Sequence, residues 1–315
     1  MKNKVGEFNK KYFAESALLI ATVFWSGTFV IVKVSLQDVS SMLFIGLRFL
    51  LATILLLPFA TKYKSEFTKS ALFSGTLLGL FFFLGFATQT VGLKFTTATN
   101  SAFITGSSVV LVPILQTLIE RKPPTKGSVI GIVFVFAGIL FLSSGGNSIF
   151  TFLSDFASNF NIGDFFTLLC AVFFAMYVVY LDISTNKHGF MVILFMQMFV
   201  TAAAAFLASS FFDMIDIEKV RIEYTEYLIF GILYTSIFAT LITTAIITRY
   251  QKNVTPTKAA IIYSLEPIFA SVLAFFLLNE KITNLGILGA VLIFTGLIIS
   301  ETYDYFRNGR EKAKS

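Results

Sequence analysis

Apolar stretches of about 20 residues recur along the whole chain, and no other feature constrains the fold as strongly. A helix of about 20 apolar residues spans the ~30 Å hydrocarbon core of a bilayer. Only 13% of the residues are charged, against about 25% in a typical soluble domain. The stretches do not alternate in polarity as the strands of a membrane barrel do. The sequence therefore predicts an all-α integral membrane protein with ten transmembrane helices, near residues 13–34, 40–60, 70–92, 97–119, 126–143, 162–181, 190–212, 226–248, 256–278 and 284–302.

Lysine and arginine residues accumulate in alternate loops. If the N-terminus is cytoplasmic, 18 of the 24 basic residues fall in cytoplasmic segments and five on the opposite side, while Arg48 lies within a span. Basic residues favour cytoplasmic loops. We therefore expect a multi-pass protein of the bacterial inner membrane with both termini in the cytoplasm. The basic charges are spread over six segments, so no nucleic-acid partner is expected.

The two halves of the chain contain matching motifs. "GIVFVFAG" (131–138) aligns with "GAVLIFTG" (289–296) at an offset of 158, and "TVFW" (22–25) aligns with "AVFF" (171–174) at an offset of 149. We predict two five-helix repeats, 1–143 and 162–303, with a periplasmic linker at 144–161 and a basic tail at 304–315. Because five is odd, the second repeat would have inverted topology. In secondary transporters, such repeats enclose a substrate site near the middle of the bilayer.

Several motifs resemble the drug/metabolite transporter superfamily, and specifically its EamA-type ten-helix branch. The resemblance covers essentially the whole chain, and it implies two repeats around a central cavity without specifying a substrate. The motifs that support it are "FWSGTFVIVK" (24–33), "LRFLLA" (47–52), "TTATNSAFITG" (96–106), "TPTKAAIIYSLEPIFASVLAFFLLNEKI" (255–282) and the glycine spacing of the last span.

Glu266 and Pro267 lie together in the middle of the ninth predicted span. A carboxylate at this depth costs several kcal/mol unless it faces protein, water or substrate. Proline lacks an N–H group and clashes with the carbonyl four residues earlier, so it bends a helix. One interpretation is that the pair lines a transport cavity, with Pro113 interrupting the fourth span at a related place. The other is that the pair only shapes and packs the ninth helix.

Further polar and aromatic residues inside the spans are candidates for substrate contact. Trp25 is the only tryptophan and lies away from the membrane interfaces where tryptophan is common. The amides among the candidates could instead bond neighbouring helices. The expected substrate-binding or coupling residues are Glu266, Trp25, Tyr263, Gln89, Asn100, Tyr177 and Tyr234.

Other residues favour structural roles. Glu15 and Asp164 are expected in the first turns of their helices, where negative charge is stabilised. Arg48 could extend to the surface or bind carbonyls between the repeats. Small residues permit close helix packing, either within the chain or in a dimer. The expected structural set is Pro267, Pro113, Arg48, Gly131, Gly138, Gly289 and Gly296.

The sequence favours a secondary transporter over other membrane proteins. A single cysteine and a single histidine make a metal site improbable, and no cofactor or enzymatic activity is expected. The chain also lacks the P-loop motif of ATP-driven pumps. We expect an exporter of amino acids or similar zwitterionic or amphipathic metabolites, with the proton as a candidate coupling ion, in a monomer or homodimer. The alternatives are a nucleotide-sugar or sugar-phosphate exchanger and, from another class, a membrane-embedded enzyme or assembly factor.

Overall fold

The computed structural model describes residues 2–144, 147–278 and 283–312, and it is helical almost throughout. The described residues form no β-strand, apart from an isolated bridge between Val39 and Ile222. The predicted all-α class is therefore confirmed. The first half contains α1 (Lys2–Ser26), α2 (Thr28–Ser35), α3 (Ser41–Ala60), the 3-10 helix η1 (Thr61–Glu66), α4 (Lys69–Phe95), α5 (Ala98–Gly106), α6 (Ser108–Glu120) and α7 (Lys126–Ser143). The rest contains α8 (Ile149–Ser158), α9 (Ile162–Lys187), α10 (Phe190–Met214), α11 (Glu226–Ser236), the π-helix η2 (Ile237–Ile242), α12 (Thr243–Tyr250), the 3-10 helix η3 (Gln251–Asn253), α13 (Pro256–Tyr263), α14 (Glu266–Leu278) and α15 (Asn284–Lys312).

Eight helical segments of the described chain are long and apolar enough to cross a membrane. They coincide with the first eight predicted spans. The ninth predicted span is divided into the short helices α13 and α14, and the tenth corresponds to an apolar stretch of α15, Asn284–Ser300. The count of ten therefore remains a prediction for these last two segments.

Hydroxyl and amide side chains fix where many of the helices begin. A helix starts with backbone N–H groups that lack a partner, and serine, threonine and asparagine side chains accept hydrogen bonds from them. The residue before α9, Asn161, accepts from the N–H groups of Gly163 and Asp164, and the Asp164 carboxylate accepts from the Asn161 N–H in return. The side chains that cap other helices in this way are Thr68, Thr97, Thr125, Ser148, Thr225 and Thr255.

The helical hydrogen bonding is interrupted within three of the predicted spans, although Gly27, Ser107 and Ser264 keep right-handed helical backbone angles. α1 and α2 meet at Gly27, α5 and α6 meet at Ser107, and α13 and α14 meet at 264–265. The interruption in the fourth segment is therefore not at Pro113, as the sequence suggested, because Pro113 is an interior residue of α6. Pro267 occupies the second position of α14, where a missing N–H group needs no partner.

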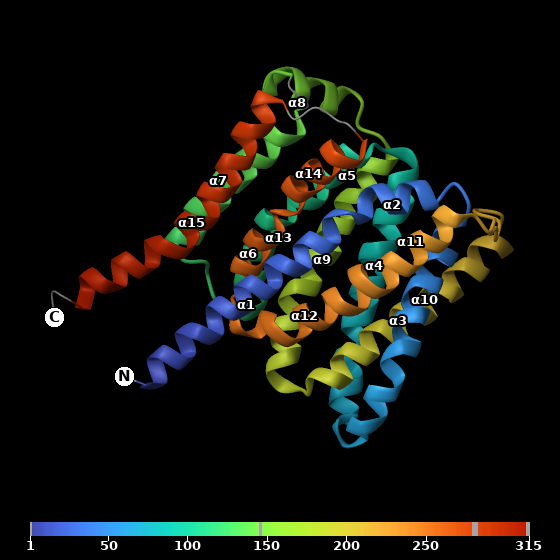
Figure 1. The fold of residues 1–315 in the computed structure, drawn as a ribbon, viewed down its shortest axis with the longest axis horizontal. Helices are drawn as coiled ribbons and strands as arrows, with labels where there is room; N and C mark the ends of the chain where they lie inside the picture. The colour runs from blue at the N-terminus through green and yellow to red at the C-terminus, as the bar shows by residue number, and fades with distance from the viewer. Residues whose placement is uncertain (1, 145–146, 279–282, 313–315) are drawn as a thin grey trace.

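Glycine residues bring α7 and α15 into backbone contact along one edge of the molecule (Figure 1). A Cβ atom added to Gly131 would lie 2.6 Å from the carbonyl oxygen of Gly296, and one added to Gly138 would lie 2.6 Å from that of Gly289. Only glycine allows so close an approach. These four residues therefore pack against one another within the chain, and their contact does not require a dimer.

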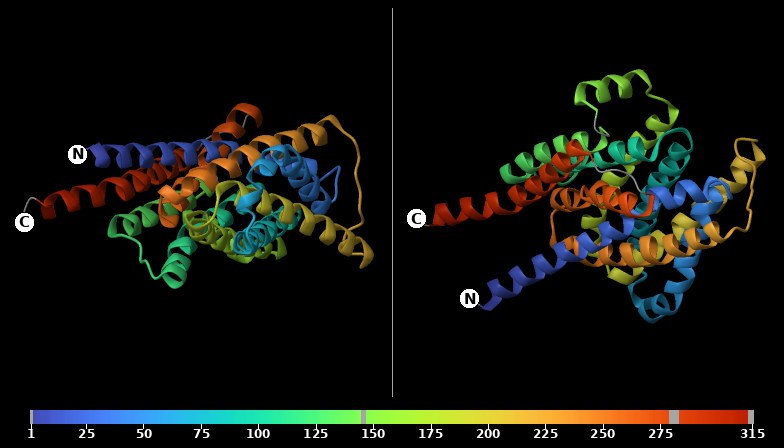
Figure 2. Two further views of the ribbon diagram at one scale, coloured as in Figure 1. Left: turned by 90° about the horizontal axis from the view of Figure 1, so that it is seen from below. Right: turned by 45° about the horizontal axis from the view of Figure 1, so that its top comes forward.

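The predicted linker contains a helix, which the sequence analysis did not anticipate. Side chains of α8 pack on α5, with the rings of Phe152 and Phe156 at 5.5 and 5.6 Å from the ring of Phe103. This helix covers one end of the bundle, whereas the N- and C-terminal helices both project from the opposite end (Figures 1 and 2). The two chain ends thus emerge on the same side of the molecule.

Candidate functional site

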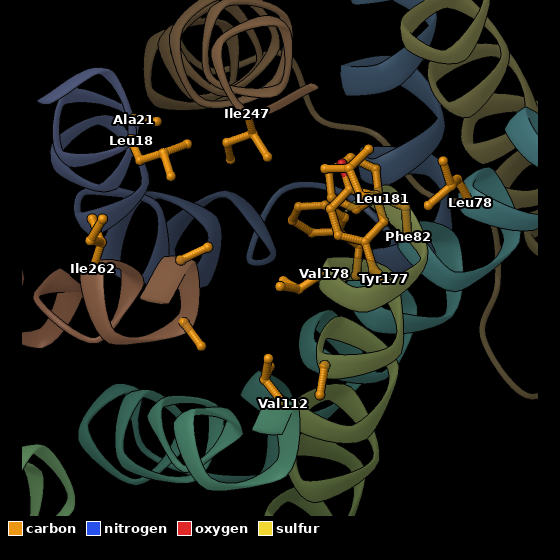
Figure 3. Packing of buried hydrophobic residues seen from close by; sticks show 14 of the residues in the cluster. Leu18, Ala21, Leu78, Phe82, Val112, Tyr177, Val178, Leu181, Ile247 and Ile262 are labelled. Carbon is orange, nitrogen blue, oxygen red and sulfur yellow. The ribbon is translucent and has the colours of Figure 1, made fainter. Parts of the chain in front are cut away.

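A cavity of about 70 Å³ lies where the interrupted helices meet. Its wall is formed by residues of α1, α2, α4, α5 and α6 from the first half, and of α9, α13 and α14 from the second. Figure 3 shows part of the surrounding packing, in which Val112 of α6 and Val178 of α9 approach the same region. The cavity is smaller than the ~300 Å³ or more of a pocket for a drug-sized ligand. It therefore fits a small ligand, or it must widen before a larger one can enter.

Five of the seven predicted site residues lie on this wall: Trp25, Gln89, Tyr177, Tyr263 and Glu266. The other two do not line it. Asn100 lies in the first turn of α5, where its N–H group donates to Thr97 Oγ1. The hydroxyl of Tyr234 donates to the carbonyl oxygen of Phe24 at 3.0 Å and so links α11 to α1. A structural role is therefore sufficient to account for Tyr234.

Trp25 connects the cavity to the second half of the chain. Its indole N–H donates to the carbonyl oxygen of Ala239 at 2.9 Å, and its ring meets the ring of Tyr263 edge to face at 5.7 Å between centroids. Ala239 belongs to the π-helix η2. π-Helical turns alter the usual backbone pairing and are frequent at functional sites.

The same carbonyl accepts a second hydrogen bond, from Arg48. The Arg48 guanidinium donates to Ala239 O at 3.3 Å and to Thr240 Oγ1 at 2.5 Å, and it lies 4.6 Å from the ring centroid of Phe86. Arg48 is only 2% exposed, so it does not extend to the surface. Of the two expectations for Arg48, the structure agrees with a contact between the two halves.

Two buried glutamines hold the tyrosines of the cavity. The Tyr263 hydroxyl donates to Gln251 Oε1 and the Tyr177 hydroxyl to Gln197 Oε1, both at 2.9 Å. Gln251 in turn donates to the carbonyl oxygen of Val178, and Gln197 donates to Thr248 Oγ1. Both glutamines are fully buried. These bonds satisfy the tyrosine hydroxyls and the buried glutamine amides, because a buried polar group without a partner is costly.

The sequence analysis had not placed these glutamines among the site residues. Gln197 carried one available signal, because an amide within an apolar span implies a polar partner. Gln251 gave no comparable signal, because it follows the predicted eighth span, where the sequence indicates a loop.

Glu266 is the first residue of α14 and reaches the cavity at the break between α13 and α14. Within the part of the chain that the structure describes, no hydrogen bond or ion pair to its carboxylate is recorded. The neighbouring wall is largely apolar and includes Phe29, Phe86 and Phe174. The arrangement thus presents one acidic group to a small aromatic cavity.

The other two acidic residues were both predicted to lie in the first turn of a helix, and only one of them does. Asp164 lies in the first turn of α9, as predicted, and accepts hydrogen bonds from Asn161 N and Thr96 Oγ1. The prediction for Glu15 is wrong, because α1 begins at Lys2 and Glu15 lies in its interior. There it lines a separate cleft of about 160 Å³ between α1, α13 and α15. A helix N-terminus therefore does not account for Glu15.

The described residues contain no group of three or more His, Cys, Asp or Glu side chains arranged to hold a metal ion. The single cysteine, Cys170, is buried in α9 beside Thr105.

Comparisons with known proteins agree with this architecture. The sequence profile of the EamA-like transporter family matches residues 13–144 and again residues 161–302. An uncharacterized transporter of Archaeoglobus fulgidus is 32% identical over 290 residues, which cover 92% of this chain and 86% of the relative. The uncharacterized transporter YyaM of Bacillus subtilis is 28% identical, with 75% of this chain and 74% of the relative covered. One solved crystal structure superposes with a TM-score of 0.74 at 15% identity, covering 93% of this chain and 97% of the other, which shows a shared fold. This chain belongs to the EamA-like transporter family.

Proposed function

We propose that this protein is a secondary transporter that exports a small metabolite across the bacterial inner membrane by alternating access around the central cavity. Family membership supports transport, and the cavity at the meeting point of three interrupted helices supports this location for the substrate. Two of these breaks, between α5 and α6 and between α13 and α14, lie at corresponding places of the proposed repeats, an arrangement typical of transporter binding sites.

Two inverted five-helix repeats, and hence ten membrane segments, are part of the proposal. The helices α5, α6 and α7 begin 158 residues before α13, α14 and α15, respectively. In the same way, α3 begins 149 residues before α10. The glycine contacts follow the same rule, since the pair Gly131–Gly296 becomes Gly289–Gly138 when the repeats are exchanged. The double match of the family profile supports the same division.

The carboxylate of Glu266 is the observation on which the proposed mechanism mainly rests. It lies at a helix break, on the wall of the cavity, and in a membrane segment where an unused charge is costly. We propose that it binds the substrate, with a proton as the candidate coupling ion at the same group. A phosphate-bearing substrate is disfavoured, because neither Arg48 nor Lys258 is among the residues that line the cavity.

Glu266→Gln is expected to reduce substrate transport at least tenfold in proteoliposomes, because it keeps the shape of the side chain and removes its charge. The assay measures uptake from a panel of small metabolites that includes amino acids, with and without a pH gradient. Loss of gradient-driven uptake with retention of substrate exchange would assign proton coupling to Glu266. Loss under all conditions would assign substrate contact alone.

Glu15→Gln is the matched control for this experiment. It removes a carboxylate from another membrane helix, in a cleft separate from the central cavity. We expect it to retain most of the transport activity. Unchanged rates for Glu266→Gln would refute the proposed role of this residue.

Thiol labelling tests the proposed orientation. Asn147 precedes α8 and is exposed, whereas Lys122 lies in the loop between α6 and α7 on the proposed cytoplasmic side. We expect Asn147→Cys to react with an impermeant reagent in intact cells, and Lys122→Cys to react only after permeabilisation. Native labelling is expected to be negligible, because Cys170 is buried. The reverse pattern would invert the topology.

A further inference from the structure

We propose that the central cavity selects an organic ammonium ion with an apolar or aromatic body, and that it excludes substrates that carry a carboxylate. This inference rests on the proposed function and narrows its substrate class. It departs from the amino acids expected from the sequence, because an amino acid brings a negative charge into the cavity together with its ammonium group.

Most hydrogen-bonding groups on the wall are already occupied by the protein. Trp25 donates to Ala239, and the hydroxyls of Tyr177 and Tyr263 donate to glutamines outside the lining. The hydroxyls of Thr28 and Ser264 donate to backbone carbonyl oxygens at 2.8 and 2.6 Å. These side chains therefore offer no free donor to a ligand, although their hydroxyl oxygens can still accept a hydrogen bond.

Thr105 Oγ1 contacts Cys170 Sγ at 4.0 Å. Three side chains of the wall remain available to a polar ligand: Glu266, Gln89 and Ser108. No side-chain hydrogen bond of these three is recorded within the described residues. An ionised carboxylate only accepts hydrogen bonds, whereas the amide and the hydroxyl can donate or accept. Glu266 is therefore the one carboxyl group of the described wall, and in its ionised form it favours a cationic group.

No basic side chain on the described wall could neutralise a bound carboxylate. Arg48, the one buried Lys or Arg among the described residues, donates to η2 and lies against the face of Phe86. The ring of Phe86 itself lines the cavity. A buried carboxylate without a cation or a set of hydrogen bonds is strongly disfavoured, and its proximity to Glu266 would add repulsion between like charges.

The aromatic side chains of the wall complement an ammonium ion. Trp25, Phe29, Phe86 and Phe174 line the cavity together with the two tyrosines. The negative face of an aromatic ring attracts a cation, and sites that recognise ammonium groups commonly combine several such rings. The same rings provide apolar contact for the body of the ligand.

Trp25 makes direct measurement of binding possible, because it is the only tryptophan in the chain and lies on the cavity wall. Intrinsic fluorescence of the purified protein can be titrated with four probes that share a phenyl group and a short chain: phenethylamine, phenylalanine, 3-phenylpropionate and 2-phenylethanol. Trp25→Phe, which removes the fluorophore, gives the background signal. The neutral probe 2-phenylethanol measures how much the apolar part of the ligand contributes to the binding affinity.

We expect phenethylamine to bind at least tenfold more tightly than phenylalanine, and 3-phenylpropionate to show no saturable signal. In Glu266→Gln, the Kd of phenethylamine should rise about tenfold and approach that of 2-phenylethanol, whose own Kd should not change. Glu266→Asp keeps the charge and should retain the preference for the amine. The ranking in the wild-type protein decides the question even if a variant fails to fold.

Several results would overturn the inference: equal or tighter binding of phenylalanine, saturable binding of 3-phenylpropionate, no saturable binding of any probe, or an unchanged amine affinity in a folded Glu266→Gln protein. Transport measurements keep this inference separate from the proposed function. If the amine binds as expected but no compound crosses the membrane, the transport proposal fails and the selectivity stands. If amino acids are transported in preference to amines, the selectivity fails and the transport proposal stands.

Discussion

Gly138→Leu is expected to lower the free energy of unfolding by about 3 kcal/mol and to separate α7 from α15. A Cβ atom at this position would lie 2.6 Å from the carbonyl oxygen of Gly289 and 2.9 Å from the N atom of Ile293. Both are backbone atoms, so a side-chain rotation cannot relieve the clash, and overpacking of this kind costs roughly 1–3 kcal/mol or more. Thermal unfolding of the purified protein in detergent measures the effect.

The partner position provides an internal check. Gly289→Leu should destabilise the protein to a similar degree, because its Cβ atom would lie 2.5 Å from the carbonyl oxygen of Gly138. Val133→Leu is the matched control, since Val133 lies on the same helix and is 63% exposed. A wild-type melting temperature for Gly138→Leu would contradict the close contact between these helices.

Replacing Gln116 and Thr257 together by cysteine is expected to stop transport under oxidising conditions, with recovery after reduction. In the structure, Gln116 Oε1 accepts from Thr257 Oγ1 at 2.6 Å and from Thr257 N at 3.2 Å, and this contact joins α6 to α13. Both residues lie near loops that we propose to be cytoplasmic. Alternating access requires this side to open during the transport cycle, and a disulfide would prevent the opening.

The experiment has little interference from native thiols, because the only cysteine, Cys170, is buried. Each single cysteine variant should transport equally well in oxidant and in reductant. Full activity of the cross-linked double variant would show that these helices do not separate during transport.

The helical fold was largely predictable from the sequence, because lipid leaves a chain few choices. Every backbone polar group in a membrane must be paired within the protein, and an apolar segment of sufficient length satisfies this requirement as a helix. The first eight apolar blocks correspond to the eight long apolar helical segments of the structure. The glycines of α7 and α15 could be recognised for a similar reason, since small residues in apolar helices mark close packing.

Local signals were less reliable where a helix extends beyond its apolar stretch. Glu15 was placed in a first turn because the apolar block begins near residue 13, whereas α1 already begins at Lys2. The polar residues before the block also belong to the helix, and the pattern of hydrophobic residues does not predict that they are helical. Pro113 likewise suggested an interruption, although α6 passes through it and the break lies at Ser107.

The sequence by itself determined the all-helical membrane fold and membership of the transporter family, because both depend on patterns that run along the chain. It also picked out Trp25, Gln89, Tyr177, Tyr263 and Glu266, which lie on one cavity wall. Only the tertiary structure decided how these residues are used. The hydroxyls of Tyr177 and Tyr263 are held by Gln197 and Gln251, and Trp25 and Arg48 share the carbonyl of Ala239 in a π-helix. These contacts join residues up to 214 positions apart. Which donors remain free for a ligand therefore depends on pairing across helices, which no local pattern specifies.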